Sequence, residues 1–192
     1  LETRSFREIS IDDLARGAGL SRSSFYFYFP SKEAVLMTLL DRLVAQTDAA
    51  AQALIDRDPA RYLRDALEGY FMMFAAHRVV LLAGNEAATS LPEVRELWNG
   101  ARESWVRVSA SAIDAERKRG AAPAGLPARD LAYALIRMNE GVLLSTFAGE
   151  QPSLPANQVV DVLETIWRNS IYGGQASYPS GRRARSNAAE GC

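Results

Sequence analysis

Residues 10–33 carry the pattern that most restricts how this chain can fold, because they fit two short helices and a tight turn into some 20 residues. Ser10 precedes the first of these helices, and Asp13 follows it at the spacing of a capping box. Gly19 lies just past the end of that helix, where a residue free to adopt positive φ is favoured, and Ser21 is placed to cap the second helix. The pattern predicts a helix-turn-helix unit.

Such a unit needs a small residue where the helices meet and an apolar anchor in the second helix. Ala15 and Phe25 supply these at suitable spacing around Gly19. The second helix then presents its polar and aromatic side chains outward. The candidate contact residues on this face and at the start of the next helix are Ser21, Arg22, Ser23, Ser24, Tyr26, Tyr28 and Lys32.

These side chains suit a DNA groove. Arg22 can fork onto a guanine, the serine hydroxyls and Tyr26 can reach base edges or phosphates, and Tyr28 and Lys32 are placed for phosphates. The segment from Leu14 to Lys32 has basic residues and no acidic one. A capped helical hairpin with a solvated face is the alternative interpretation. A net charge of −1 argues against general coating of polyanions.

The rest of the chain is also predicted to be helical, since apolar-periodic stretches are separated by Gly and Pro and no alternating run indicates a strand. The expected helices cover residues 32–56, a segment starting at Pro59, and residues 79–89, 92–120, 128–148 and 156–172. We expect a DNA-binding domain at 1–45, a ligand-binding and dimerisation domain at 46–173 and a disordered tail at 174–192.

Composition excludes several classes of protein. Hydrophobic residues make up 48% of the 192 residues, enough for a sizeable core, yet no run of about 18 apolar residues predicts a membrane span. The first residues show no signal-peptide pattern, which favours the cytoplasm. His77 and Cys192 are the sole histidine and cysteine, so a catalytic triad, a histidine-rich metal site and an intrachain disulfide are unsupported. We expect no catalytic residues, metal or cofactor.

Large aromatic side chains gather in the C-terminal helices. Trp98 and Trp105 are seven residues apart on one helix face, and Tyr70 and Phe74 are one turn apart. An aromatic stripe at helical spacing is usually core, but it also suits the wall of a ligand pocket. Asn139 lies among apolar residues, so its burial requires a hydrogen-bond partner, either a neighbouring helix or a ligand carbonyl.

Three segments then make a family resemblance specific. Residues 11–15, 18–21 and 25–34 (IDDLA, AGLS and FYFYFPSKEA) resemble the signature of TetR-family repressors, and the similarity continues through residues 112–123, 147–153 and 166–173. The resemblance implies an all-α homodimer with an N-terminal DNA-binding domain and a C-terminal ligand domain. It also implies that the last two helices form the dimer interface.

The resemblance further implies an elongated, mostly apolar pocket. The ligand-binding residues expected on this basis are Tyr62, Tyr70, Phe74, Trp98, Arg102, Trp105, Asn139, Leu144 and Trp167. Arg102 occupies a position where the family has an apolar residue, and Ile136 one where it has a second amide. We therefore expect a charge to gate or shorten this pocket.

The expected function is a repressor that leaves operator DNA when an apolar small molecule binds, with a neighbouring Baeyer–Villiger-type monooxygenase gene as its target. The expected partners are double-stranded operator DNA, an apolar ligand and a second copy of the chain, and no membrane. The alternative is a helical small-molecule-binding protein without DNA binding. Residues 1–4 resemble only the end of the family's first helix. Either a stretch of sequence is missing before them, which we favour, or the DNA-binding module is short of a packing partner.

Overall fold

The computed structural model describes the backbone of residues 4–52 and 59–173, and the side chains of residues 4–50 and 63–173. The predicted tail at 174–192 and the side chain of Tyr62 lie outside the described residues. All regular structure in the described ranges is helical, which confirms the predicted all-α class. The elements are η1 (Phe6–Glu8), α1 (Ile11–Gly17), α2 (Arg22–Tyr28), α3 (Lys32–Gln52), α4 (Pro59–Ala87), α5 (Pro92–Lys118), α6 (Ala128–Ala148), η2 (Ala156–Gln158) and α7 (Val159–Tyr172).

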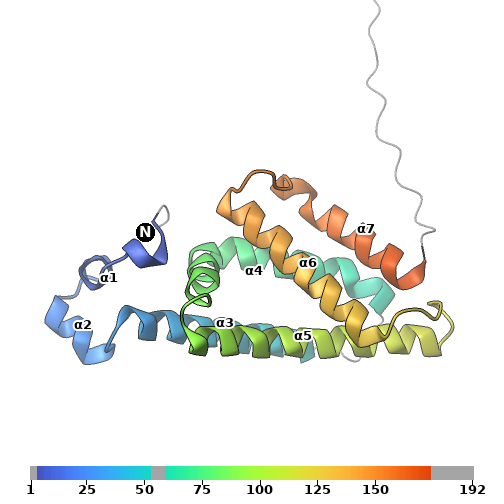
Figure 1. Cartoon of the computed structure of the whole chain (residues 1–192), viewed down its shortest axis with the longest axis horizontal. Helices are drawn as coiled ribbons and strands as arrows, with labels where there is room; N and C mark the ends of the chain where they lie inside the picture. The colour runs from blue at the N-terminus through green and yellow to red at the C-terminus, as the bar shows by residue number, and fades with distance from the viewer. Residues whose placement is uncertain (1–3, 53–58, 174–192) are drawn as a thin grey trace, which may run out of the picture.

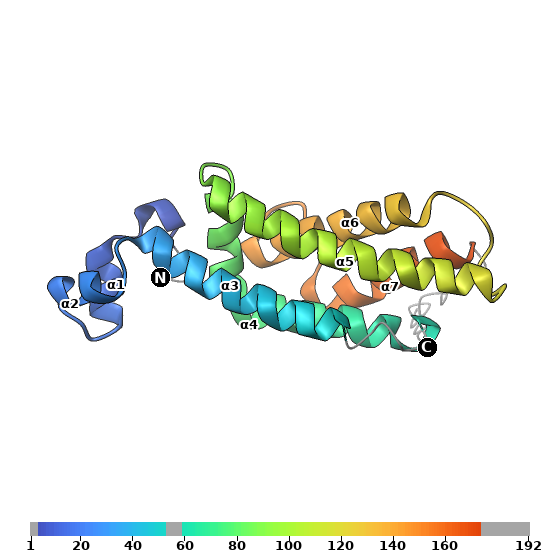
Figure 2. The same cartoon turned by 90° about the horizontal axis from the view of Figure 1, so that it is seen from below.

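The molecule is elongated, with a small helical module at one end and a helical bundle at the other (Figure 1). The module consists of η1, α1 and α2, and α3 runs from it into the bundle alongside α5 (Figures 1 and 2). Helix α6 packs on α4 and α5, and α7 packs on α4 and α6, so both lie on the side of the bundle away from α3. The long α3 therefore belongs physically to both parts, and the predicted boundary at residue 45 falls inside it.

The module forms as its sequence predicts. The Asp13 backbone N–H donates to Ser10 Oγ at 3.1 Å, and the Ser10 N–H donates to the Asp13 carboxylate at 3.0 Å, which completes the capping box of α1. Gly19 adopts a φ of 69° in the turn between the helices. Ala15 and Phe25 are only 2% and 4% exposed, so both serve as the buried anchors expected of them.

The predicted helix at residues 79–89 corresponds to the second stretch of α4. His77 has non-helical φ and ψ angles of −119° and 21°, so two helical stretches meet at a kink there. The second stretch ends at Ala87, two residues earlier than expected. The last helix begins at Val159 rather than residue 156, because residues 156–158 form the 3₁₀ turn η2.

Within the described residues, the stretch Leu63–Ala87 of α4 is long and apolar enough to cross a membrane by length and composition alone. In the structure this helix packs against α3, α5, α6 and α7, and the side chains it buries there include Leu67, Phe74 and Leu81.

Two apolar clusters hold the helices together. The larger one fills the bundle between α4, α5, α6 and α7. The smaller one, which we call the junction cluster, consists of the buried residues Leu36, Leu40, Ala87 and Val94, with Phe6 and Trp98 among the side chains packed against them. Because Phe6 belongs to the N-terminal module, the junction cluster joins that module to the bundle. The Phe6 N–H also donates to the Glu86 carboxylate at 2.8 Å, which ties η1 to α4.

Candidate functional site: an exposed helix face and an apolar cavity

Helix α2 presents the exposed face that the sequence predicts. Its start is capped by Ser21, whose Oγ accepts from the Ser24 N–H at 3.1 Å and lies 2.9 Å from Ser23 Oγ. The predicted contact residues that the structure places on this exposed surface are Ser21, Arg22, Ser23, Ser24, Tyr26 and Tyr28. Their contact with DNA stays a prediction.

Phe27 is not among the predicted contact residues, yet its side chain is 85% exposed. It stands edge-on to Tyr28, with the ring centroids 5.3 Å apart. An exposed phenylalanine gains nothing from water, so a partner that covers this end of α2 would stabilise it. The sequence does indicate this exposure. Residues Phe25–Phe29 are all aromatic, and because only one side of so short a helix can pack on its neighbour, some of these rings must be exposed.

Arg22 is not free in this structure. Its Nη1 donates to Asp12 on α1 at 2.8 Å, and its guanidinium lies 5.8 Å from the centre of the Tyr26 ring. Both members of the ion pair are well exposed, so water and salt screen it. A phosphate or guanine could therefore replace the carboxylate at modest cost.

Lys32 has a different position from the one expected. Its ammonium donates to the backbone carbonyls of Phe6, Arg7 and Ile9 at 2.8, 3.1 and 2.9 Å, and it lies 4.8 Å from the centre of the Phe6 ring. All three of its donors are thus used to hold η1 against the start of α3. A phosphate contact by Lys32 stays a prediction, and it would cost one of these bonds.

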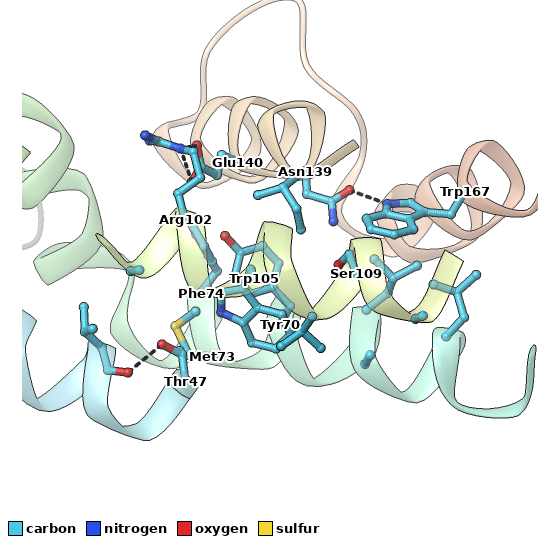
Figure 3. A pocket seen from close by; sticks show the side chains of 18 of the residues that line it. Thr47, Tyr70, Met73, Phe74, Arg102, Trp105, Ser109, Asn139, Glu140 and Trp167 are labelled. Carbon is cyan, nitrogen blue, oxygen red and sulfur yellow. Dashed lines mark hydrogen bonds and ion pairs between the residues drawn. The ribbon is translucent and has the colours of Figure 1, made fainter. Parts of the chain in front are cut away.

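A cavity of about 130 Å³ lies between α3, α4, α5, α6 and α7 (Figure 3). Seven of the predicted ligand residues line it: Tyr70, Phe74, Trp98, Arg102, Trp105, Asn139 and Trp167. Leu144 is not among the lining residues and packs on the larger core cluster, so its contact with a ligand stays a prediction. The side chains that α6 turns to the cavity are Ile136, Asn139 and Glu140.

Helix α3 supplies a wall of the cavity that sequence reasoning missed. Leu40, Leu43, Val44 and Thr47 all line it, although residues up to 45 were assigned to the DNA-binding domain. The apolar stripe along this helix was visible in the sequence, but only the tertiary arrangement shows which helices it meets. The consequence is that the helix carrying the N-terminal module also touches whatever occupies the cavity.

Asn139 makes the hydrogen bond to a neighbouring helix that was considered for it, and its contact with a ligand stays a prediction. Its side chain is 3% exposed, and its Oδ1 accepts from the Trp167 indole N–H at 3.0 Å. Because an indole N–H can only donate, the oxygen of the amide must face Trp167. The amide nitrogen then points toward the cavity (Figure 3), and no residue of the described part of the chain accepts from it.

The charge expected from Arg102 is neutralised rather than free. Its Nε lies 3.0 Å from both carboxylate oxygens of Glu140, and its Nη1 donates to Asn99 at 2.7 Å. Arg137 reaches the same carboxylate at 2.6 Å. The Arg102–Glu140 pair ties α5 to α6 beside the cavity, so Arg102 contributes its stem to the wall (Figure 3).

A second carboxylate lines the cavity near the C-terminal ends of α5 and α7. Glu116 is only 1% exposed and accepts from Arg119 Nε at 2.7 Å and Nη2 at 2.6 Å. The Tyr172 hydroxyl donates to it at 2.8 Å, and burial together with this carboxylate raises the pKa of Tyr172. Each carboxylate in the lining is therefore paired with arginine.

Known protein families match both the N-terminal part, which carries α2, and the C-terminal part, which contains most of the cavity. Residues 1–38 match the family described as bacterial regulatory proteins, tetR family, and residues 63–173 match the C-terminal domain of transcriptional regulator EthR. The chain is 52% identical over 177 residues to the HTH-type transcriptional regulator EthR of Mycobacterium tuberculosis, covering 90% of this chain and 82% of that protein. This chain belongs to the TetR family. It is an EthR-like transcriptional regulator and not an enzyme.

Other relatives extend the agreement. The EthR protein of Mycolicibacterium smegmatis is 48% identical over 176 residues, covering 90% of this chain and 81% of that protein. Among solved structures, the fatty acid degradation regulator FadR of Bacillus halodurans superposes with a TM-score of 0.71 at 15% identity over 92% and 91% of the two chains. Thermus thermophilus FadR, solved in complex with lauroyl-CoA, gives 0.60 at 21% identity over 95% and 93%. These two structural likenesses support the TetR-like fold alone.

Proposed function

We propose that this TetR-family regulator is a repressor that leaves its operator when an uncharged, mostly apolar small molecule occupies the cavity. The observation that carries the proposal is that Leu40 of α3 lines the cavity and also belongs to the junction cluster. The same residue thus touches the ligand site and the packing that holds the N-terminal module. A ligand that moves it changes the position of the module.

In this proposal α2 enters the major groove of operator DNA. Arg22 exchanges Asp12 for a base edge or phosphate, while Ser23, Ser24 and Tyr26 contact the groove and Tyr28 contacts the backbone. Ser21 caps the helix, and Phe27 is added to the proposed surface on account of its exposure. Lys32 acts mainly by fixing η1 against α3.

The size of the cavity supports the coupling between ligand and DNA. At about 130 Å³ it is near the volume of cavities that admit a molecule as small as benzene, roughly 150 Å³. A longer ligand must therefore push the walls apart, and one of those walls is α3. A ligand shifts the equilibrium only if it binds the widened arrangement better than the DNA-binding one.

A homodimer through α6 and α7 completes the proposal. Ile166 on α7 and Tyr133 on α6 leave 37% and 54% of their surface exposed, and α7 has a pronounced apolar stripe. A symmetric dimer would present two copies of α2 at about 34–36 Å, one turn of B-DNA, or a multiple of it. The regulator would act on cytoplasmic DNA, and on the strength of its similarity to EthR we propose a neighbouring Baeyer–Villiger-type monooxygenase gene as the target.

The test is a gel-shift titration of the full chain on DNA from upstream of its own gene, repeated at several salt concentrations and with octan-2-one as the cavity probe. We expect a salt-sensitive shift that the probe weakens. A complete lack of binding to that DNA at low salt would contradict the repressor and favour a small-molecule-binding protein without DNA-binding activity.

Trp105→Ala separates the response to the probe from DNA binding itself. Trp105 lines the cavity and is remote in the chain from α2. The variant should therefore lose most of the response to octan-2-one while its DNA affinity in the absence of probe stays within about twofold of wild type. Parallel loss of both properties would show that Trp105 is a packing residue, and a thermal melt of the variant reports that directly.

A further inference from the structure

Tyr70 places a hydroxyl group in the cavity that the proposed function does not yet use. Its ring, on α4, stands edge-on to Phe74 with centroids 5.1 Å apart and is tilted against Trp105 at 6.2 Å (Figure 3). Within the described residues the hydroxyl makes no hydrogen bond. Buried tyrosines normally find a partner, and an unmet donor in an apolar site costs free energy.

The environment keeps this hydroxyl in its neutral form. Burial raises the pKa of Tyr70, and the nearby Glu140 carboxylate raises it further, with Arg102 opposing the effect. The group remains protonated at neutral pH and is therefore able to donate a hydrogen bond.

A second unused donor faces the same cavity from α6. The Asn139 amide is fixed by Trp167 so that its nitrogen is left over for the cavity. The two donors come from different helices, α4 and α6, and both side chains line the cavity (Figure 3). An occupant that meets only one of them leaves the other without an acceptor.

The charged lining residues exclude an ionic occupant. Arg102 is paired with Glu140, and Glu116 is paired with Arg119. A carboxylate or ammonium group brought into the cavity would lose its hydration without gaining an unpaired counter-charge.

We propose that the ligand of this cavity is an uncharged molecule with two hydrogen-bond acceptors on an apolar body, one bound by the Asn139 amide nitrogen and the other by the Tyr70 hydroxyl. This inference rests on the proposed function, because it assumes that the cavity is the ligand site. It adds Tyr70 as a residue that determines specificity through its oxygen rather than its ring.

Three classes of probe test the proposal on the whole protein by calorimetry: octane, octan-2-one, and the set of octane-2,5-, 2,6- and 2,7-diones. These molecules have nearly the same apolar body and carry none, one or two acceptors. The diones vary the distance between the acceptors. We expect at least one dione to bind wild-type protein about fivefold to tenfold more tightly than octan-2-one.

Tyr70→Phe removes only the oxygen and keeps the ring. The variant should bind octan-2-one within about twofold of wild type and should lose the preference for the dione. Ser111→Ala is the control that also removes one hydroxyl, because Ser111 is exposed on α5 and does not line the cavity. It should change neither affinity, and thermal melts of both variants check that folding is intact.

The outcomes separate this inference from the function on which it rests. If octan-2-one binds but no dione binds better, or if Tyr70→Phe weakens ketone and dione equally, the two-acceptor proposal is overturned and the ligand site stands. If none of the probes binds wild-type protein, both are contradicted.

Discussion

At the scale of single residues, the two positively charged side chains predicted to face DNA, Arg22 and Lys32, both have partners within the protein. Asp12 occupies the Arg22 guanidinium, and three backbone carbonyls occupy the Lys32 ammonium. The first arrangement is an exposed ion pair that DNA can displace. The second is a set of three hydrogen bonds that stabilises the module. Arg22 is therefore the better candidate for a contact that forms only on DNA.

Asp12→Asn tests this difference. The substitution removes the carboxylate that competes for Arg22 and takes one negative charge from the DNA-facing side, so DNA affinity should rise by about twofold to tenfold. Arg22→Ala should lower affinity and reduce the steepness of its salt dependence. Fluorescence anisotropy on labelled upstream DNA at several salt concentrations measures both. Unchanged DNA affinity in Asp12→Asn would contradict the proposal that Arg22 exchanges Asp12 for DNA.

Short-range features of single residues could be predicted from the sequence. Ser10, Gly19 and Phe25 have the cap, the turn conformation and the burial expected of them, because each depends on neighbours within a few positions. The absence of Leu144 from the cavity lining could not be predicted in this way, and the partners of Lys32 lie more than 20 residues away. Such contacts depend on how helices pack, which spacing along one helix does not specify.

At the scale of elements, the capping box makes the start of α1 sensitive to acid. Hydrogen bonds from Ser10, its side chain first and its backbone next, lower the pKa of Asp13 from 3.8 to about 2, and Arg4 adds to the effect. A carboxyl group whose folded pKa is lowered stabilises the folded state fully above its unfolded pKa, and it loses that contribution as the pH falls through the folded value.

The expected result is that the cap of α1 loses its stabilisation between about pH 4 and pH 2. The Asp13 carboxyl carbon, followed by NMR, should titrate with a midpoint of about 2 in wild type. In Ser10→Ala the midpoint should move up toward the ordinary value for aspartate. A wild-type midpoint near that ordinary value would mean that the box does not form in solution.

Helix packing at Gly84 gives a second test at this scale. A Cβ atom there would lie 2.8 Å from Trp98 and 2.9 Å from Leu40, so both side chains of the junction cluster would have to shift. Gly84→Ala should therefore lower the melting temperature by roughly 3–10 °C. Gly69→Ala, on the same helix with nothing within 4 Å, should raise it slightly. Equal melting temperatures for the two variants would contradict the close crossing of α3, α4 and α5.

The kink in α4 marks the limit of prediction for elements. Helix existence and type followed from apolar periodicity, and most boundaries agreed with the Gly and Pro positions. The break at His77 agrees with the helix predicted to start at residue 79. The direction in which the second stretch leaves the kink could not be predicted, because it depends on tertiary contacts on both sides, where Phe74 and Leu81 are buried.

At the scale of the whole molecule, the central claim is that one helix serves two sites. Helix α3 begins at the module, passes through the junction cluster at Leu36 and Leu40, and lines the cavity as far as Thr47. The sequence predicted a linking helix but divided it between two domains. In the proposed function, this double role lets a ligand in the bundle affect DNA binding, and the proposal requires a coupling free energy between the two sites.

The most direct measurement is the affinity of octan-2-one for the protein alone and for the protein bound to its upstream DNA. If the sites are coupled, the probe must bind the DNA complex more weakly, and by the same factor by which it weakens DNA binding. We predict a factor of about 5 or more in both directions. Equal affinity of octan-2-one for the free protein and for the DNA complex would contradict the account.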